Sequence, residues 1–177
     1  MEFNRLCDII LEGFAVRSYS CLMLDCQFLY EQIKVLHSNI DERDIFNGPG
    51  HGLEHESHIT VLYGIHEETP KVVYDSLSLY PAEFTLTGLS LFEDDEFDVL
   101  KFTVKSPDLH DLNDQAKNKL SCTSKFLKYE PHLTICYLLP GTGKKYLKSK
   151  CDIIGKKYFS DQFIFSNKNS EKVYWKV

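Results

Sequence analysis

One eight-residue pattern occurs twice in the sequence, at positions about half the chain apart. Residues 56–63 read ESHITVLY and residues 130–137 read EPHLTICY. Glutamate, histidine, threonine and tyrosine fall at the same offsets in both copies, and three of the four other positions in each copy are apolar. Short alternations of polar and apolar residues are typical of a strand with one buried face. We therefore expect two related lobes about an approximate two-fold axis, each contributing one such strand.

The spacing within each copy decides which side chains share a face. Alternate residues of a strand point to the same side, so His58 lies on the face of Thr60, and His132 lies on the face of Thr134. The apolar residues between them can pack into the interior. If the two strands lie side by side, two imidazoles and two hydroxyls converge on one cleft, which can bind an anion and move protons from opposite sides.

The outer positions of the pattern predict less. By the same alternation, Tyr63 and Tyr137 fall on the face opposite to the histidines, which indicates core packing. Glu56 and Glu130 fall on the histidine side. Either glutamate could orient an imidazole, or both could lie at solvated strand ends.

This set of residue types suits phosphodiester cleavage without a metal ion. One neutral histidine can take a proton from an attacking hydroxyl while the other, protonated, gives a proton to the leaving oxygen. Histidine serves both roles because its ordinary pKa of about 6.5 makes both forms available near neutrality. The threonine hydroxyls would hold the phosphate oxygens on which negative charge develops. The interpretation is a hydrolase with two histidines as general base and general acid.

A zinc site is the alternative for the histidines. His51, His55 and His58 are close in sequence, and three histidines can bind zinc. However, His51 and His55 lie in a glycine-rich segment, and the second copy of the pattern has no equivalent. The segment 48–52 also lacks the Lys-Ser/Thr of a phosphate-binding P-loop, which favours a mobile loop near the site. We predict neither a metal nor a cofactor.

Length and composition narrow the class of protein. The chain has 177 residues, 43% hydrophobic and 26% charged, which predicts a single domain over residues 1–177. No apolar run approaches the roughly 20 residues of a membrane span, and Glu2 and Arg5 interrupt the apolar start where a signal peptide would lie. The six cysteines form no C-x-x-C pair, so we expect free thiols in a cytoplasmic protein without a membrane partner.

The charge is unevenly distributed along the chain. The net charge of −6 argues against a protein that coats long nucleic acid. Yet residues 141–177 hold nine lysines and three acidic residues. These lysines could hold a phosphate through their local field, or simply coat exposed surfaces. The only tryptophan, Trp175, is flanked by lysines and could stack on a nucleobase. The oligomeric state stays open.

Hydrophobic periodicity and turn residues predict a mixture of helices and antiparallel strands. Strands are expected at 18–25, 58–65, 83–92, 97–105, 132–138, 159–166 and 172–177. Helices are expected at 2–12, 28–36, from Pro70 to before Pro81, 107–120 and 143–151, with a loop over 41–57. The pattern indicates an α+β fold in which antiparallel sheets line a central cleft and helices lie outside.

The paired His-x-Thr motifs resemble those of the 2H phosphoesterase superfamily. More narrowly, the segment 52–64, the strand over 17–25 and the single C-terminal tryptophan are similar to the anti-CBASS phosphodiesterases of tailed bacteriophages. Those enzymes degrade the cyclic di- and trinucleotides that bacteria use as antiviral signals. The resemblance implies metal-independent cleavage of a 3′–5′ linkage, as in 3′,3′-cGAMP, by attack of the adjacent ribose 2′-hydroxyl.

The resemblance also assigns roles to individual residues. The catalytic pairs would be His58 with Thr60 and His132 with Thr134. Residues that would contact the substrate are Tyr19 and Trp175 by stacking on bases, Glu171 at a base edge, and Lys125 or Lys128. Core packing remains the alternative for Tyr19. Two other functions stay open, namely a 2H phosphodiesterase acting on 2′–5′ oligoadenylates or RNA 2′,3′-cyclic phosphate ends, and a sponge that binds a cyclic nucleotide without cutting it.

Overall fold

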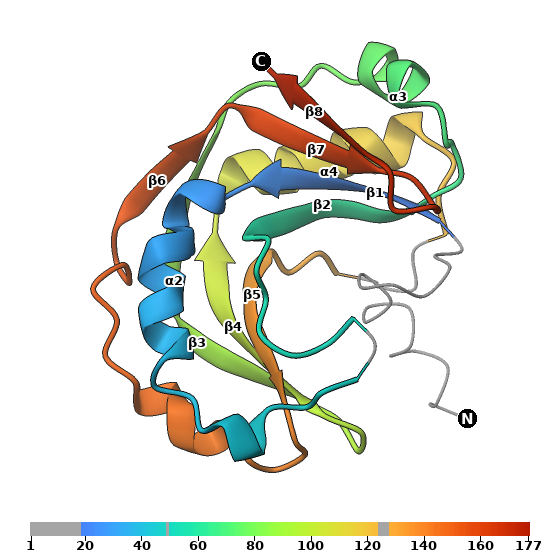
Figure 1. The fold of residues 1–177 in the computed structure, drawn as a ribbon. Coiled ribbons are helices and arrows are strands. Elements are labelled where there is room, and N and C mark those ends of the chain that lie inside the picture. Colours follow the sequence, from blue (N-terminus) through green and yellow to red (C-terminus); the bar gives the residue numbers. More distant parts are fainter. Residues whose placement is uncertain (1–18, 49, 124–127) are drawn as a thin grey trace.

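The computed structural model describes residues 19–48, 50–123 and 128–177. Within this part of the chain, eight strands form one antiparallel sheet in the order β6-β3-β4-β5-β2-β1-β7-β8. The sheet is strongly curled, with the helices around its outside (Figure 1). The predicted α+β class is confirmed, although one continuous sheet takes the place of the separate sheets that we expected.

Most predicted elements are present with closely similar bounds. The strands are β1 (Ser20–Asp25), β2 (His58–Ile65), β3 (Ala82–Glu93), β4 (Asp98–Lys105), β5 (His132–Leu138), β6 (Lys157–Ser160), β7 (Gln162–Ser166) and β8 (Lys172–Lys176). The α-helices are α2 (Tyr30–His37), α3 (Pro70–Ser76) and α4 (Pro107–Lys119), and 3₁₀ turns occur at η1 (Gln27–Leu29), η2 (Glu42–Asp44) and η3 (Gly143–Lys148). The helix expected at 2–12 lies outside the described residues.

The two strands that carry the repeated pattern are neighbours in the middle of the sheet. β2 pairs with β5, and each then leads into three further strands. We call β2-β1-β7-β8 the first half and β5-β4-β3-β6 the second half. The repeat therefore marks the junction of two four-strand halves.

The predicted strand 159–166 is two strands, because the chain crosses there from one half to the other. β6 pairs with β3 at one edge of the sheet, whereas β7 pairs with β1 in the first half. Only Asp161 separates the two strands. Figure 1 shows them running nearly end to end, so this crossing links the two ends of the curled sheet.

The main core lies against one face of the sheet, which we call the helix face. Ile59 and Val61 of β2, with Leu133 and Ile135 of β5, are completely buried there and join one cluster with the apolar residues of α2 and α4. Burying each such side chain contributes about 1.5–3 kcal/mol. The opposite face carries the histidines of the repeat, and we call it the histidine face.

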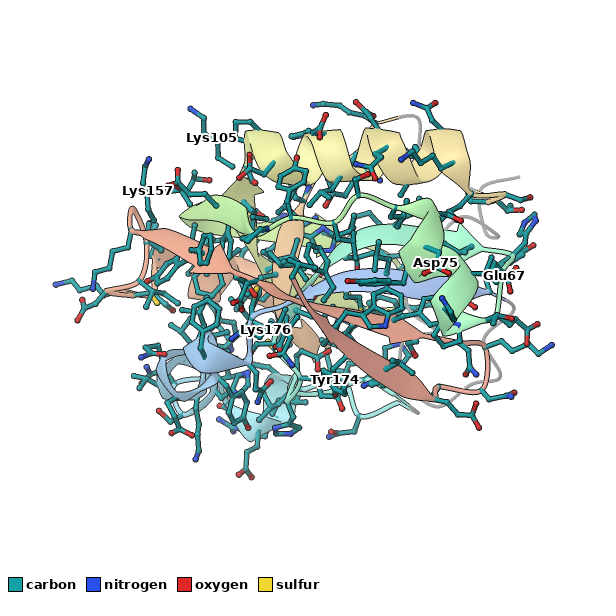
Figure 2. The ribbon with its side chains drawn as sticks, turned by 90° about the horizontal axis from the view of Figure 1, so that it is seen from above. Glu67, Asp75, Lys105, Lys157, Tyr174 and Lys176 are labelled. Carbon is teal, nitrogen blue, oxygen red and sulfur yellow. The ribbon has the colours of Figure 1, made fainter. Side chains whose placement is uncertain are left out.

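Helix α4 is well specified by its sequence. The Ser106 side chain caps it by accepting a hydrogen bond from the Leu109 amide at 3.1 Å, and Pro107 occupies the first turn, where its missing N–H is harmless. Lysines in the last turn suit the negative end of the helix dipole. In the view from above, α4 forms a layer along the sheet, and Lys105 projects from the surface beside it (Figure 2). No helix in the described ranges is long and apolar enough to cross a membrane.

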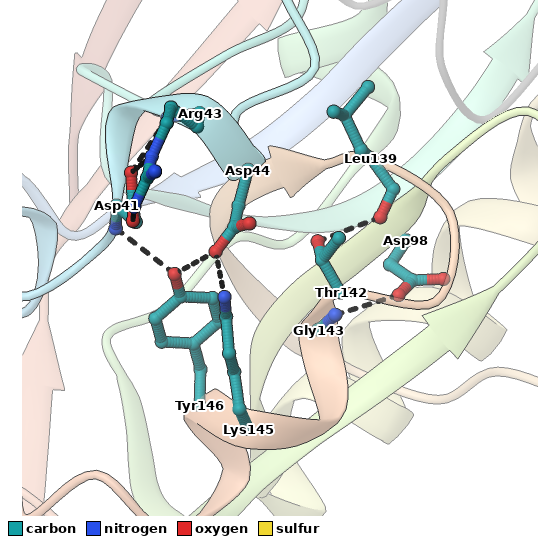
Figure 3. Close-up of polar contacts among 9 residues, drawn as sticks. All are labelled: Asp41, Arg43, Asp44, Asp98, Leu139, Thr142, Gly143, Lys145 and Tyr146. Carbon is teal, nitrogen blue, oxygen red and sulfur yellow. Dashed lines mark hydrogen bonds and ion pairs between the residues drawn. The ribbon is translucent and has the colours of Figure 1, made fainter.

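A polar cluster ties η2 to η3 (Figure 3). The Asp44 carboxylate accepts a hydrogen bond from the Tyr146 hydroxyl and pairs with the Lys145 ammonium, while the Tyr146 hydroxyl accepts from the Asp41 amide at 3.0 Å. Lys145 and Tyr146 together hold the pKa of Asp44 below its ordinary value. The cluster fixes the start of the segment that leads from α2 to β2.

Candidate active site

The histidines and threonines of the repeat lie together on the histidine face. Ile59 of β2 is the cross-strand partner of Leu133 in β5. Extending this antiparallel register by one residue in each direction places His58 opposite Thr134 and Thr60 opposite His132. All four side chains are half-buried. Each imidazole therefore lies across from the hydroxyl of the other strand, so the arrangement is symmetric.

The two imidazoles are held in the same way. The Nδ1 atom of His58 lies 2.6 Å from the carbonyl oxygen of Glu56, and Nδ1 of His132 lies 2.9 Å from the carbonyl oxygen of Glu130. A carbonyl oxygen can only accept, so Nδ1 carries a proton in both rings. This leaves Nε2 as the nitrogen that can gain or lose a proton.

The glutamates of the pattern thus orient the histidines through their backbone. Their carboxylates are engaged elsewhere, that of Glu56 with Lys172 and that of Glu130 with Lys128 at 3.0 Å. The bond to Lys128 is the main reason why the pKa of Glu130 lies below its ordinary value. The glutamate side chains are therefore exposed at the strand ends, as one of the two alternatives predicted, and the imidazoles are oriented by main-chain carbonyls.

Each repeat strand contains a β-bulge at the same position. Met23 of β1 pairs with Thr60 and Leu22 pairs with Leu62, so Val61 is skipped. In β5 the pairing passes from Thr134 to Cys136 in the same way and skips Ile135. An extra residue on one strand reverses the alternation beyond it.

The bulges overturn one prediction. Tyr63 pairs with Cys21, two residues from Met23, and Tyr137 pairs with Val99, two residues from Lys101. Both tyrosines therefore lie on the histidine face, contrary to the strict alternation that we assumed. They pack in two small clusters separate from the main core.

The main-chain carbonyls of the two skipped residues accept hydrogen bonds from buried polar side chains on the helix face. Asn113 of α4 donates from Nδ2 to the carbonyl of Val61 at 2.6 Å, and His37 of α2 donates from Nε2 to the carbonyl of Ile135 at 2.9 Å. Burial lowers the pKa of His37, which keeps the ring neutral. The sequence analysis missed both residues, and the only signal was a polar residue on the apolar side of each helix.

Two irregular segments extend the repeat strands. The glycine-rich segment before β2 runs along β5, where the Phe46 amide donates to the Tyr137 carbonyl at 3.0 Å and the Tyr137 amide donates to Gly52 at 2.8 Å. The Glu54 amide donates to the Ile135 carbonyl at 2.9 Å. This segment therefore forms a border of the site through main-chain pairing.

A matching segment runs along β2. The Thr123 amide donates to the Gly64 carbonyl at 2.9 Å, and the His66 amide donates to the Ser121 carbonyl at 3.0 Å. Gly64 has φ +89°, and a Cβ there would collide with the Thr123 carbonyl. Only glycine suits this close approach.

The strands on either side of the repeat differ in chemistry. In the second half, β4 places Lys101 opposite Thr134 and Thr103 opposite His132. In the first half, β1 places Met23 opposite Thr60 and Asp25 opposite His58. The histidine face is therefore cationic and hydroxylic on the β4 side, whereas the β1 side joins an apolar cluster with a carboxylate at its end.

Tyr19 lies at the far end of the first half. Its ring stacks on His66 with centroids 5.4 Å apart and meets the edge of Tyr63 at 6.4 Å. Because Tyr63 is on the histidine face, Tyr19 borders the same face. Its aromatic ring is half-buried.

The two C-terminal candidates have contacts of their own in the structure. Trp175 pairs with Phe163, stacks on Phe165 at 5.8 Å and meets Tyr74 of α3 at 5.2 Å, so it packs with the main core at the helix face. Glu171 accepts a hydrogen bond from Asn167 at 2.7 Å and closes the turn between β7 and β8. Lys128 is exposed, and Lys125 lies outside the described residues.

The three histidines considered for zinc have different surroundings. His51 packs among Phe46, Phe97 and Tyr137, with its ring 4.9 Å from that of Tyr137. His55 shares a hydrogen bond with the Tyr30 hydroxyl at 2.7 Å. Among the described residues, no group of three histidine, cysteine or acidic side chains is arranged to hold a metal ion.

Comparison with known proteins establishes the fold. No protein-family model matches the chain, and no curated protein sequence does. Among solved structures, Escherichia coli LigT complexed with 3′-AMP matches with a TM-score of 0.57 at 14% identity, covering 90% of this chain and 94% of LigT. A structure described as a phosphoesterase matches with a TM-score of 0.52 at 15% identity, covering 90% and 95%.

A third similar structure is Kluyveromyces marxianus Usb1 with uridine monophosphate. It matches with a TM-score of 0.52 at 8% identity and covers 90% of this chain and 98% of Usb1. The matches span nearly the full length of both proteins. The chain therefore has the curled, antiparallel fold of the LigT-like 2H phosphoesterases, as the sequence resemblance predicted.

Proposed function

We propose that this protein is a metal-independent phosphodiesterase in which His58 and His132 act as general base and general acid. One observation carries the proposal. The two imidazoles lie on adjacent strands, each fixed through Nδ1 by the carbonyl two residues before it and each opposite a threonine of the other strand. This leaves the Nε2 atom of each imidazole to take a proton from a substrate, or to give one to it, on the same face of the sheet.

The reaction would need only groups that the site holds. A ribose 2′-hydroxyl attacks the adjacent phosphorus while one Nε2 takes its proton, and a new P–O2′ bond forms. The P–O5′ bond breaks as the other, protonated imidazole gives its proton to O5′. Thr60 and Thr134 would donate hydrogen bonds to the non-bridging oxygens, where charge develops. The products are a 2′,3′-cyclic phosphate and a free 5′-hydroxyl, and attack of water on the cyclic phosphate by the reverse roles completes hydrolysis.

For the substrate, we propose cyclic di- and trinucleotide antiviral signals such as 3′,3′-cGAMP, degraded in the cytoplasm of a bacterial host to evade CBASS defence. The sequence resemblance to the phage phosphodiesterases supports this class. Two of the similar structures are complexes with small nucleotides, LigT with 3′-AMP and Usb1 with uridine monophosphate. Small nucleotide substrates also agree with the acidic chain, which is unsuited to coating long nucleic acid.

Of the residues proposed to contact a base, Tyr19 is the best placed, because it borders the histidine face beside Tyr63. It already stacks on His66, and stacking on a nucleobase would contribute about 1–3 kcal/mol per base. Trp175 packs with the core on the helix face and Glu171 closes a turn, so for both residues contact with a base is proposed from the resemblance. Lys125 remains a proposal from the resemblance alone.

A substrate panel tests the function. The wild-type protein is incubated in EDTA with cyclic di- and trinucleotides, 2′–5′ oligoadenylates and RNA bearing a 2′,3′-cyclic phosphate, and the products are separated by chromatography. We expect cleavage of the cyclic oligonucleotides, and no cleavage of an all-2′-deoxy analogue. Cleavage that disappears with the chelator would overturn the metal-independent mechanism.

The same panel separates the alternatives. Cleavage restricted to 2′–5′ linkages or to cyclic phosphate ends would support the proposed phosphodiesterase activity but contradict the proposed substrate. Recovery of unaltered cyclic nucleotide after long incubation with a stoichiometric amount of protein would contradict an enzymatic function and would favour a protein that binds the nucleotide without cutting it. His58→Ala and His132→Ala serve as matched controls, since both remove an imidazole from the histidine face.

A further inference from the structure

The charged residue nearest in register to the histidine pair on the second half is Lys101, which the sequence analysis did not single out. It stands in β4 directly opposite Thr134, and Ser90 of β3 is its partner on the other side. Because cross-strand partners share a face, the lysine projects on the histidine face. Its side chain is half-buried.

The ammonium group lies beside an aromatic ring of the neighbouring strand β3. Lys101 Nζ lies 5.9 Å from the centroid of the Phe92 ring, within range of a cation–π contact. Phe92 belongs to β3, on the side of β4 away from β5, while Glu130, just before β5, also acts on the ammonium electrostatically. The contact with Phe92 therefore anchors the charge over β4 and β3, next to the strand that carries His132.

Lys101 also differs from the lysines that the charge distribution first suggested. Ion pairs with carboxylates are made by Lys144, Lys145, Lys157, Lys168, Lys172 and Lys176 of the basic C-terminal region. Within the described part of the chain, Lys101 makes no such pair. Glu130 is close enough to affect it electrostatically, but its carboxylate bonds Lys128.

The surroundings of Lys101 suit an anion. Burial lowers the pKa of its ammonium, so the charge has given up part of its hydration. Beside it, the Thr103 hydroxyl donates to the Ser90 hydroxyl at 3.0 Å, which gives this patch a polar surface. A desolvated cation next to hydroxyl groups attracts a phosphate more strongly than an exposed lysine does.

We infer that Lys101 binds a second phosphate of the substrate, other than the one between His58 and His132. The site is then selective for ligands that carry two phosphates a nucleotide apart, such as cyclic dinucleotides, over ligands with one. This inference rests on the proposed function for its choice of ligand. It adds a specificity-determining residue to the proposed site. It also gives the bound ligand an orientation, with its second phosphate toward β4 and β3.

Binding of uncleavable ligands tests the inference independently of catalysis. A cyclic all-2′-deoxy dinucleotide carries two phosphates, and the linear dinucleoside d(ApA) carries one. Calorimetry would give Kd for both ligands with the wild-type protein, Lys101→Gln, Lys101→Arg and the control Lys105→Gln. Lys105 is on the same strand and projects from the surface beside α4 (Figure 2).

We expect Lys101→Gln to weaken binding of the cyclic ligand about 10- to 100-fold, the usual range for losing a charge-assisted hydrogen bond. Binding of d(ApA) should change less than about threefold, and Lys101→Arg should restore most of the loss. Lys105→Gln should leave both constants unchanged. Equal losses for the two ligands, or no loss for either, would overturn the inference.

The outcomes also separate this inference from the proposed function. If the ribose form of the cyclic dinucleotide is never cleaved while Lys101→Gln still selectively weakens the cyclic ligand, the proposed function fails and the second phosphate site holds. If the ribose form is cleaved but Lys101→Gln affects both ligands alike, the enzyme holds and the second phosphate site fails. Failure of the wild-type protein to bind the cyclic deoxy ligand would reject the second phosphate site, whatever the outcome of the cleavage assay.

Discussion

The two strands of the repeat are nearly interchangeable, whereas the strands beside them are not. β2 and β5 share the His-x-Thr spacing, the Nδ1–carbonyl bond and the bulge. Their outer neighbours diverge, since Lys101 faces Thr134 on one side and Met23 faces Thr60 on the other. A symmetric pair of proton carriers cannot by itself orient a substrate. In the proposed function, the duplicated strands would therefore supply the chemistry, while the unlike neighbours would decide which way a ligand binds.

The largest effect should come from the histidines, and it tests whether the two halves are equal. His58→Ala and His132→Ala should each lower kcat/KM about 10²- to 10⁴-fold, because each removes one proton transfer. Steady-state kinetics on the best substrate of the panel would measure both losses. His110→Ala, on exposed α4 surface, should retain activity. A loss of kcat/KM in only one of the two variants would show that the two histidines do not contribute equally to catalysis.

The second largest effect should come from the threonine hydroxyls of the two His-x-Thr motifs. Thr60→Val and Thr134→Val keep the shape of the side chain and remove the donor, so each should lower kcat about 10²- to 10³-fold with a smaller change in KM. Thr87→Val, an exposed threonine of β3, is the matched control. An effect confined to KM would mean that the hydroxyls bind the ground state and give no added stabilisation to the transition state.

The bulges offer a test on stability. Asn113→Ala should lower the free energy of unfolding by about 1–3 kcal/mol, because the Val61 carbonyl would be buried without its donor. Chemical denaturation measures the loss, with the exposed Asn118→Ala on the same helix as control. If the bulge positions the strand, kcat should fall as well at temperatures where the variant is fully folded. Unchanged kcat would reduce Asn113 to a purely structural residue.

The smallest effect concerns His37, which holds the other bulge. Burial lowers its pKa in the folded protein, so the unfolded chain binds the proton more readily. The free energy of unfolding should therefore be highest above the ordinary pKa of about 6.5 and should fall as the pH drops toward the folded value. His37→Gln keeps a donor for the Ile135 carbonyl and should flatten this part of the pH profile. An identical pH profile of the unfolding free energy for variant and wild type would contradict the assignment of this pH dependence to His37.

Much of the site could be read from the sequence because it rests on local patterns. The bounds of β2 and β5 match the prediction, since the repeat contains its own strand alternation. Tyr63 and Tyr137 were assigned to the wrong face, because a bulge depends on the register with another strand, which no single segment reveals. Lys101 was missed for the same reason, as its role depends on being opposite Thr134. Trp175, which is flanked by lysines in the sequence, packs against Phe165 and Tyr74, and its contact with a base stays a prediction.

The central claim is that the two imidazoles divide the work on one phosphate, one as base and one as acid. A change of leaving group tests it most directly. Uridine 3′-(4-nitrophenyl) phosphate has a leaving group that needs no proton, so the variant that lacks the acid should recover most of its activity on this ester. The variant that lacks the base should stay inactive. The account predicts recovery in one of His58→Ala and His132→Ala and not in the other, and equal recovery or equal inactivity of the two would contradict it.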